Sequence, residues 1–339
     1  MITATNQSGH NYLFRDNQYS DMTIDHTSQL NQLSTTGIWC AALTPQQPDR
    51  SIDTTRFADH IRHLLGVGCH GIAVFGTTGE ANSFTVAERK RGLDALLETG
   101  VDPSQLMAGT GCCALPDTIE LCRHALSVGC SRLLMLPPFY YKNLDNAGLI
   151  GAYASVIEDL ADSRAQLFIY HFPAMSGVPV PVEVITDLAE RFPGTVAGVK
   201  DSSGDPENLR ALLDALPNLA IFPGSETLLI KGLAHGAAGC ISATANANPA
   251  GIRRVFDAWA ADEEVEQVEA QAIAVRKIFQ QLPLVAALKQ YRAWIDDEPG
   301  WRTTRPPLQF LSPAQASWLR EQLSACGMPN ANASLLGES

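Results

Sequence analysis

The sequence lacks several features that would assign it to a membrane, a secretory or a nucleic-acid-binding class. It has no uninterrupted apolar run long enough to cross a bilayer. Its first 36 residues are polar and carry no basic-then-apolar secretion signal. Basic residues are scarce, with 24 Lys and Arg against 36 Asp and Glu and a net charge of −12. We therefore expect a cytoplasmic protein with a small-molecule partner, with neither nucleic acid nor membrane as a partner.

Metal-binding cysteine patterns are also missing. The eight cysteines form no CxxC pair and have no histidine neighbours at zinc-ligand spacing. Most of them stand inside apolar runs, which predicts reduced, buried thiols and no metal site. The adjacent Cys112 and Cys113 leave one alternative open, a reactive pair.

What the sequence does contain is an alternation of short apolar runs with amphipathic stretches. Several runs are apolar nearly throughout, as parallel strands covered on both faces require. Eight such β–α units predict a (β/α)₈ TIM barrel, an α/β fold. An open doubly wound sheet is the alternative, but no GxGxxG turn follows the first run. The candidate strands are Gly37–Pro45, His70–Gly76, Gln105–Gly111, Arg132–Pro138, Gln166–Pro173, Val196–Ser203, Leu219–Gly224 and Gly239–Asn246.

Helix-start signals lie between the strands. Thr85 with Glu88, and Asp117 with Glu120, have capping-box spacing, and Asp205-Pro206 has the form of an N-cap followed by proline.

The chain outside the barrel divides into three further segments. From about residue 249 onward the pattern is helical, which predicts a C-terminal helical extension. We expect a mobile N-terminal arm (1–36), the barrel (37–250), the last barrel helix with the extension (251–326), and a tail (327–339). The helices expected near the C-terminus are Val255–Leu282, Leu284–Trp294 and Pro313–Leu323.

Lys200 is the first candidate for chemistry. In a TIM barrel the active site lies at the C-terminal ends of the strands, and Lys200 ends the apolar run 196–199. Burial disfavours the charged form of a lysine, so its free amine becomes available to attack a ketone carbonyl. The alternative is a lysine that reaches solvent and pairs with Asp201.

Two further segments at the same end of the barrel carry hydroxyl groups. Tyr170 ends the preceding strand, where its phenol could transfer protons beside Lys200. His171 alternates to the opposite face, so we expect a structural role for it. The turn 76–80 combines two glycines with Thr77 and Thr78, which suits a carboxylate, although such turns are also common as ordinary N-caps.

Taken together, these segments resemble the dihydrodipicolinate synthase / N-acetylneuraminate lyase family. The similarity covers roughly residues 35–325, with the motifs in family order and spacing. The segments that carry it are Gly76-Thr77-Thr78-Gly79-Glu80, Pro138-Phe139-Tyr140-Tyr141, Tyr170-His171-Phe172-Pro173-Ala174-Met175-Ser176-Gly177, Gly198-Val199-Lys200-Asp201 and Ile241-Ser242-Ala243-Thr244-Ala245-Asn246.

The resemblance implies a lyase that binds pyruvate as a Schiff base on Lys200 and uses no metal or other cofactor. It implies a homotetramer, and a homodimer is the alternative. Tyr170 is implied as the proton-transfer residue, with Thr77 and Thr78 as ligands of the pyruvate carboxylate.

Two more residues take their roles from the resemblance. It implies that Tyr140 completes a Thr–Tyr–Tyr hydroxyl relay from or toward a neighbouring subunit. The backbone at Ile241 is implied to line the pyruvyl pocket.

Departures from the family pattern bear on the substrate. Dihydrodipicolinate synthases carry an arginine where this chain has Met175, and neuraminate lyases carry an acidic pair where it has Gly224-Ser225-Glu226-Thr227. These differences favour aldol cleavage or condensation of a 2-keto-3-deoxy sugar acid, with Ser225 and Glu226 contacting its hydroxyls. The alternatives are a dehydratase or deaminase using the same imine, a 4-hydroxy-tetrahydrodipicolinate synthase, and a non-catalytic 2-oxo acid sensor.

Overall fold

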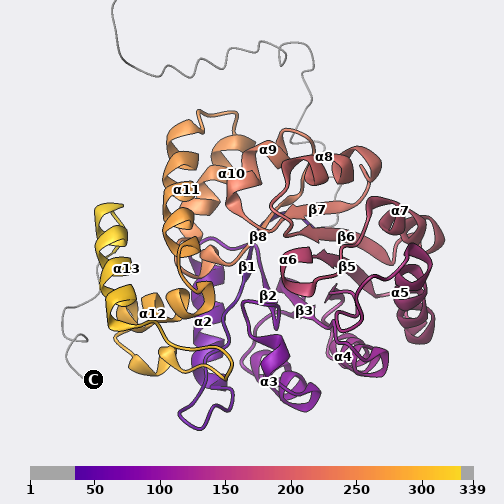
Figure 1. Cartoon of the computed structure of the whole chain (residues 1–339), viewed down its shortest axis with the longest axis horizontal. Helices are drawn as coiled ribbons and strands as arrows, with labels where there is room; N and C mark the ends of the chain where they lie inside the picture. Colours follow the sequence, from indigo (N-terminus) through magenta and orange to yellow (C-terminus); the bar gives the residue numbers. More distant parts are fainter. Residues whose placement is uncertain (1–34, 330–339) are drawn as a thin grey trace, which may run out of the picture.

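Eight parallel strands form a TIM barrel in the computed structural model, which describes residues 35–329 (Figure 1). The strand order is β7-β6-β5-β4-β3-β2-β1-β8. A hydrogen bond of 2.9 Å from the Ala238 N–H to the Ile221 carbonyl links the segment before β8 to β7. The predicted fold is therefore confirmed. The strands are β1 (Gly37–Ala41), β2 (Gly71–Val74), β3 (Leu106–Gly109), β4 (Arg132–Met135), β5 (Gln166–His171), β6 (Val196–Asp201), β7 (Ala220–Pro223) and β8 (Gly239–Ser242).

Each strand is covered on both faces, which explains why its sequence is apolar throughout. Side chains such as Met107 and Phe168 fill the barrel interior. Their neighbours along the same strands, such as Leu106 and Leu167, pack in the larger core beneath the surrounding helices. Because successive strand residues point to opposite faces, a strand between two apolar layers needs apolar residues at every position.

The surrounding helices begin where two of the three predicted signals place them. Thr85 and Glu88 form a capping box, and Asp205 caps the helix that begins at Pro206. The signal at Asp117 is wrong, because that helix begins at Leu115 and Asp117 lies in its first turn. The helices are α2 (Thr54–Gly66), α3 (Val86–Glu98), α4 (Leu115–Ser127), α5 (Asn146–Leu160), α6 (Pro173–Ser176), α7 (Val182–Arg191), α8 (Pro206–Ala215), α9 (Leu229–Leu233) and α10 (Pro249–Ala260).

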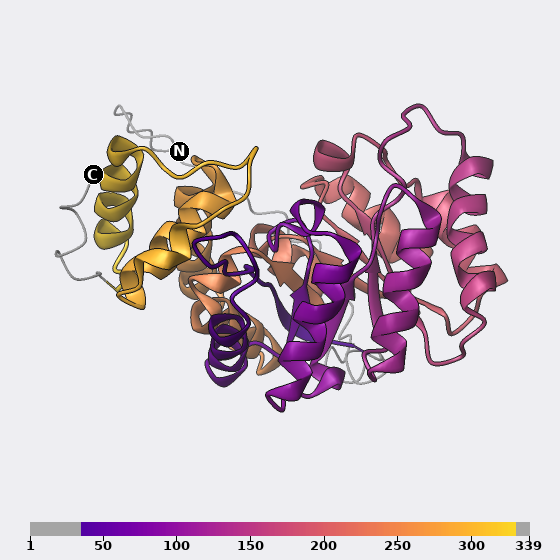
Figure 2. The same ribbon diagram turned by 90° about the horizontal axis from the view of Figure 1, so that it is seen from below.

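Three helices form the C-terminal extension beside the barrel (Figure 2): α11 (Glu266–Gln280), α12 (Leu284–Ile295) and α13 (Pro313–Ala325). The extension has its own apolar cluster, which includes Phe279, Tyr291 and Leu319. The prediction of one helix over 255–282 is wrong, because α10 ends at Ala260 and Asp262 takes a left-handed conformation with φ 56°. The predicted N-terminal arm and tail lie almost wholly outside the described residues.

The cysteines differ in their burial, as the prediction of mostly buried thiols allows. Five cysteines are buried, and burial raises the pKa of the Cys122 thiol to about 12. Cys113 is exposed, because it stands in the loop that follows β3 and not in an apolar strand. Within residues 35–329, no helix is long and apolar enough to span a membrane. The same residues contain no cluster of three or more His, Cys, Asp or Glu side chains that could hold a metal.

A buried ion pair joins the extension to the barrel. Lys289 of α12 is fully buried and pairs with Glu80, which follows β2 and is 3% exposed. Gln46 donates to the second carboxylate oxygen at 3.0 Å, and the Lys289 ammonium also donates to the Thr303 carbonyl at 2.7 Å. Burial lowers the pKa of Lys289, and the Glu80 carboxylate opposes that change. These contacts connect the β1–α2 loop, the turn after β2 and the extension.

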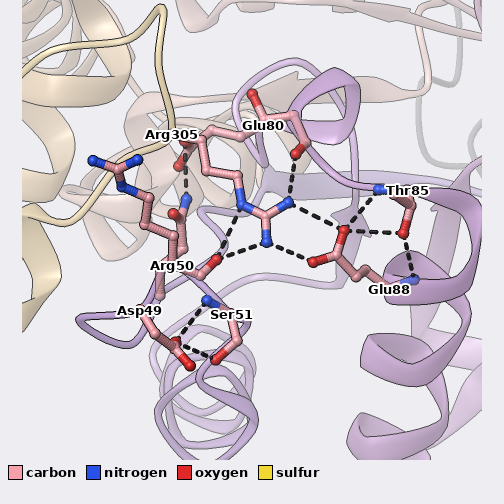
Figure 3. A network of polar contacts seen from close by, with 9 residues as sticks. Asp49, Arg50, Ser51, Glu80, Thr85, Glu88 and Arg305 are labelled. Carbon is pink, nitrogen blue, oxygen red and sulfur yellow. Dashed lines mark hydrogen bonds and ion pairs between the residues drawn. The ribbon is translucent and has the colours of Figure 1, made fainter.

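Arg305 adds a second connection nearer the surface (Figure 3). Its guanidinium donates to both carboxylate oxygens of Glu88 at 2.5 and 3.1 Å, and to the Arg50 carbonyl at 2.8 and 3.0 Å. The hydrogen bond from Arg305 is the largest cause that lowers the pKa of Glu88 to about 2. The segment before α13 is therefore held to α3 and to the loop after β1.

We predict that Lys289→Met destabilises the protein by about 3–5 kcal/mol, because it leaves the Glu80 carboxylate buried without its partner. The double variant Glu80→Gln/Lys289→Met should recover much of this loss, since it removes both charges. Urea unfolding monitored by circular dichroism measures the difference. Lys277→Met on the exposed face of α11 is the control. A loss of less than about 1 kcal/mol for Lys289→Met would contradict the prediction.

Candidate active site

Lys200 is a buried amine inside the barrel. It is the fifth residue of β6 and is 3% exposed. Its Nζ atom lies 4.3 Å from the centroid of the Tyr170 ring, the residue aligned with it on β5. The alternative pairing with Asp201 is excluded, because that carboxylate accepts from the Ser203 N–H at 2.9 Å and from the Asn208 amide at 3.1 Å. Adjacent residues of a strand face opposite sides.

The Tyr170 hydroxyl reaches the turn after β2. It lies 3.3 Å from the Thr77 hydroxyl, and the ring stacks on Phe172 with a centroid distance of 5.8 Å. His171, next along the strand, points away, and its Nδ1 accepts from the Val180 N–H at 3.0 Å. The expected structural role of His171 agrees with this bond, and burial lowers the pKa of its imidazole.

The turn between β2 and the 3₁₀ turn η1 (Ala81–Ser83) is held in an unusual backbone conformation. Phe75 and Glu80, on either side of it, are left-handed with φ 53° and 56°, which is costly for non-glycine residues. The Thr44 hydroxyl donates to the Gly79 carbonyl at 2.8 Å. Gly109 of β3 is needed beside the turn, because a Cβ there would lie 2.0 Å from the Phe75 carbonyl oxygen. These contacts and the Glu80 ion pair fix the positions of the two threonines.

A cavity of about 600 Å³ opens at the C-terminal ends of the strands. It brings together eight of the ten residues that the sequence analysis singled out, from strands and turns that lie far apart in the chain. They are Thr77, Thr78, Tyr170, Met175, Lys200, Gly224, Ser225 and Ile241.

Two predicted residues lie elsewhere. Tyr140 is 74% exposed in the loop after β4 and contacts the Tyr141 ring, so within one chain it does not join Thr77 and Tyr170. Glu226, which begins the 3₁₀ turn η3 (Glu226–Leu228), is 2% exposed and does not line the cavity.

The role predicted for Glu226 is therefore corrected. Its carboxylate accepts hydrogen bonds from the hydroxyls of Ser242, at 2.5 Å, and Thr244. These bonds use both of its oxygens to join η3 to the end of β8, so it is not placed to contact substrate hydroxyls.

Other cavity residues were missed by the sequence analysis, and several come from the C-terminal extension. Arg276 is the clearest case. It stands on α11 between the buried Val275 and Phe279, and an arginine within an apolar helix face was the one signal available. Other missed lining residues are Phe172, Ser202, Ser203, Gln280, Leu284 and Gln309.

The arrangement suits addition of an amine to a carbonyl. Lys200 pairs with no carboxylate among residues 35–329, and a hydroxyl pair stands beside it for proton transfer. Thr77 and Thr78 offer hydroxyl donors to an anionic group on the same molecule.

Comparison with known proteins agrees with this geometry. Residues 34–326 match the dihydrodipicolinate synthetase family. An uncharacterized DapA-like lyase of Chloroflexus aurantiacus is 39% identical over 84% of this chain and 94% of the relative. One of Halobacterium salinarum is 31% identical over 86% and 94%. The crystal structure of dihydrodipicolinate synthase from Agrobacterium tumefaciens superimposes with a TM-score of 0.80 at 29% identity, covering 86% of this chain and 99% of that one.

Proposed function

This chain belongs to the dihydrodipicolinate synthetase family of lyases, and from that premise we propose that Lys200 forms a Schiff base with the 2-oxo carbon of its substrate. The observation that carries the proposal is the buried Lys200 amine, which has no carboxylate partner among the described residues and shares a cavity with Tyr170 and Thr77. An unpaired buried lysine is costly, so it is retained where its free amine is used.

The reaction follows from the chemistry of the imine. The amine adds to the 2-oxo carbon and water leaves, which gives a protonated imine whose nitrogen accepts electrons. When the C3–C4 bond breaks, its electron pair forms the enamine of pyruvate, and the C4 hydroxyl loses its proton to become an aldehyde. Protonation at C3 and hydrolysis of the imine then release pyruvate and regenerate Lys200.

The side chains around Lys200 supply the other functions. Tyr170 takes and returns the proton of the C4 hydroxyl, with Thr77 as its hydrogen-bond partner at 3.3 Å. Thr77 and Thr78 hold the carboxylate next to the 2-oxo group, and Ile241 lines the pyruvyl end of the cavity. No metal or other cofactor is required, because the imine nitrogen is the electron acceptor.

We propose that the substrate is a 2-keto-3-deoxy sugar acid. The cavity of about 600 Å³ is much larger than pyruvate needs, so it has room for the aldehyde part of a longer molecule. Gly224 and Ser225 line the cavity and offer a backbone group and a hydroxyl to that part, and Met175, an exposed lining residue, is neutral. Cleavage yields pyruvate and an aldehyde, whereas a dehydratase or deaminase would yield a dioxo acid or a semialdehyde.

Borohydride reduction after incubation with pyruvate should place a covalent adduct on Lys200. Peptide mass spectrometry identifies the modified residue. Lys200→Ala should abolish the adduct, and Lys231→Ala, at an exposed lysine of α9, should leave it unchanged. Folded protein that gives no adduct, or an adduct that persists in Lys200→Ala, would contradict the imine mechanism.

Tyr170→Phe should lower kcat by about 100- to 10,000-fold, because it removes the proton-transfer group and keeps the ring beside Lys200. Steady-state formation of pyruvate from a 2-keto-3-deoxy sugar acid measures the loss. Tyr153→Phe is the matched control, since Tyr153 is a buried tyrosine of α5 outside the cavity. Equal activity in the two variants would remove Tyr170 from the mechanism.

We propose that the enzyme is a homotetramer or homodimer. Tyr140 and Tyr141 are 74% and 71% exposed on one chain, and a second copy that covers them would bring the Tyr140 hydroxyl toward a neighbouring relay. Sedimentation equilibrium should give at least twice the mass of one chain, and Tyr140→Phe should lower activity without changing that mass. A fully active monomer would exclude this arrangement.

A further inference from the structure

Arg276 is a buried cation in the wall of the active-site cavity. It belongs to α11 of the C-terminal extension, is 8% exposed and lines the same cavity as Lys200. Among the described residues that line this cavity, Lys200 and Arg276 are the basic ones, and Asp201 is the acid. Since Lys200 is used for the imine, Arg276 is the cation left for a second group of the substrate.

The guanidinium of Arg276 is poorly satisfied by its surroundings. Its Nε atom is buried without a hydrogen-bond partner in the part of the chain that the structure describes. Its Nη1 atom lies 3.4 Å from the Thr244 hydroxyl, near the limit of a hydrogen bond. Thr244 donates its own proton to Glu226, so the Glu226 carboxylate is connected to Arg276 only through a neutral hydroxyl.

No carboxylate within the described residues forms an ion pair with Arg276. A guanidinium stays charged at any working pH, and a buried charge without a partner is expensive. An anionic ligand in the cavity would supply the missing partner.

We infer that Arg276 is a specificity-determining residue that binds a carboxylate at the far end of the substrate, so that the substrate is a 2-oxo acid with a second, distal carboxylate. The inference rests on the proposed function, because it assigns the 2-oxo end to Lys200. The planar guanidinium group can form two parallel hydrogen bonds to a carboxylate. Among its described lining residues the cavity has one such cation available, which balances the single negative charge of a carboxylate better than the double charge of a phosphate.

The position of Arg276 in the cavity agrees with this role. Lys200, Thr78 and Ile241 are buried at the strand ends and form the floor. Gln280, one helical turn beyond Arg276 on the same wall, is exposed. Arg276 therefore belongs to the helical wall of the cavity and not to the strand ends that hold Lys200 and the proposed pyruvyl site.

The test compares 2-oxoadipate with 2-oxohexanoate, which have the same chain length and differ only in the distal carboxylate. Each acid is incubated with the full chain, reduced with borohydride, and quantified as an adduct on Lys200. In the wild type, 2-oxoadipate should reach half-maximal labelling at a concentration about 10- to 100-fold lower than 2-oxohexanoate, as a charge-assisted pair provides.

Arg276→Gln should abolish that preference and leave labelling by 2-oxohexanoate and by pyruvate within about threefold of the wild type. Arg276→Lys should keep part of the preference for 2-oxoadipate, because lysine supplies the positive charge but not the planar guanidinium group. The control Lys277→Gln, at the neighbouring exposed position, should behave as the wild type. Equal labelling by the two acids in the wild type would overturn the inference. So would an equal loss of both in Arg276→Gln, which would place Arg276 at the shared 2-oxo end or make it merely structural.

Calorimetry in the Lys200→Ala background separates this inference from the imine proposal, because binding there needs no covalent step. A preference for 2-oxoadipate that disappears in Lys200→Ala/Arg276→Gln supports the carboxylate site even where pyruvate labels no lysine. Equal affinity of Lys200→Ala for 2-oxoadipate and 2-oxohexanoate overturns the inference, even where the wild type forms the pyruvate adduct on Lys200 normally.

Discussion

The ion pair between Glu80 and Lys289 is the contact on which the geometry of the cavity depends. Both groups are removed from water, and each needs the other to offset the cost of leaving it. Glu80 ends the strained turn that carries Thr77 and Thr78, whereas Lys289 belongs to the helical extension. One interaction therefore fixes a part of the floor and orients the elements that build the wall.

Two buried lysines of this chain differ in their partners. Lys289 has a carboxylate and a carbonyl as partners, so its ammonium is engaged in structural contacts. Lys200 faces the ring of Tyr170 and the open cavity, with no carboxylate partner among the described residues. Only an amine free of such partners can add to a carbonyl. Both lysines are buried, so it is the partners of each that distinguish the proposed nucleophile, Lys200, from the structural Lys289.

The cavity is lined by residues from two parts of the chain, the barrel and the C-terminal extension. Its floor comes from the strand ends and holds the residues that we assign to imine formation and proton transfer. Its outer wall comes partly from α11 and the segment before α13, which contribute Arg276 and Gln309. Arg276 and Gln309 take no part in the Glu80–Lys289 ion pair, so substitutions at these two positions can change substrate selection without removing the contact that holds the floor.

The barrel and most of the floor can be predicted from the amino-acid sequence alone. Apolar runs ending in polar residues locate strand ends, and parallel strands in a closed barrel bring those ends to one side, so Lys200, Tyr170 and Thr77 were predicted to meet. The direction of the Glu226 side chain and the place of Arg276 in the cavity follow only from the packing of the folded chain. Periodicity tells which face of α11 is buried, but not which element covers that face. That depends on the packing of the extension against turns separated from it by tens to hundreds of residues, which no local pattern encodes.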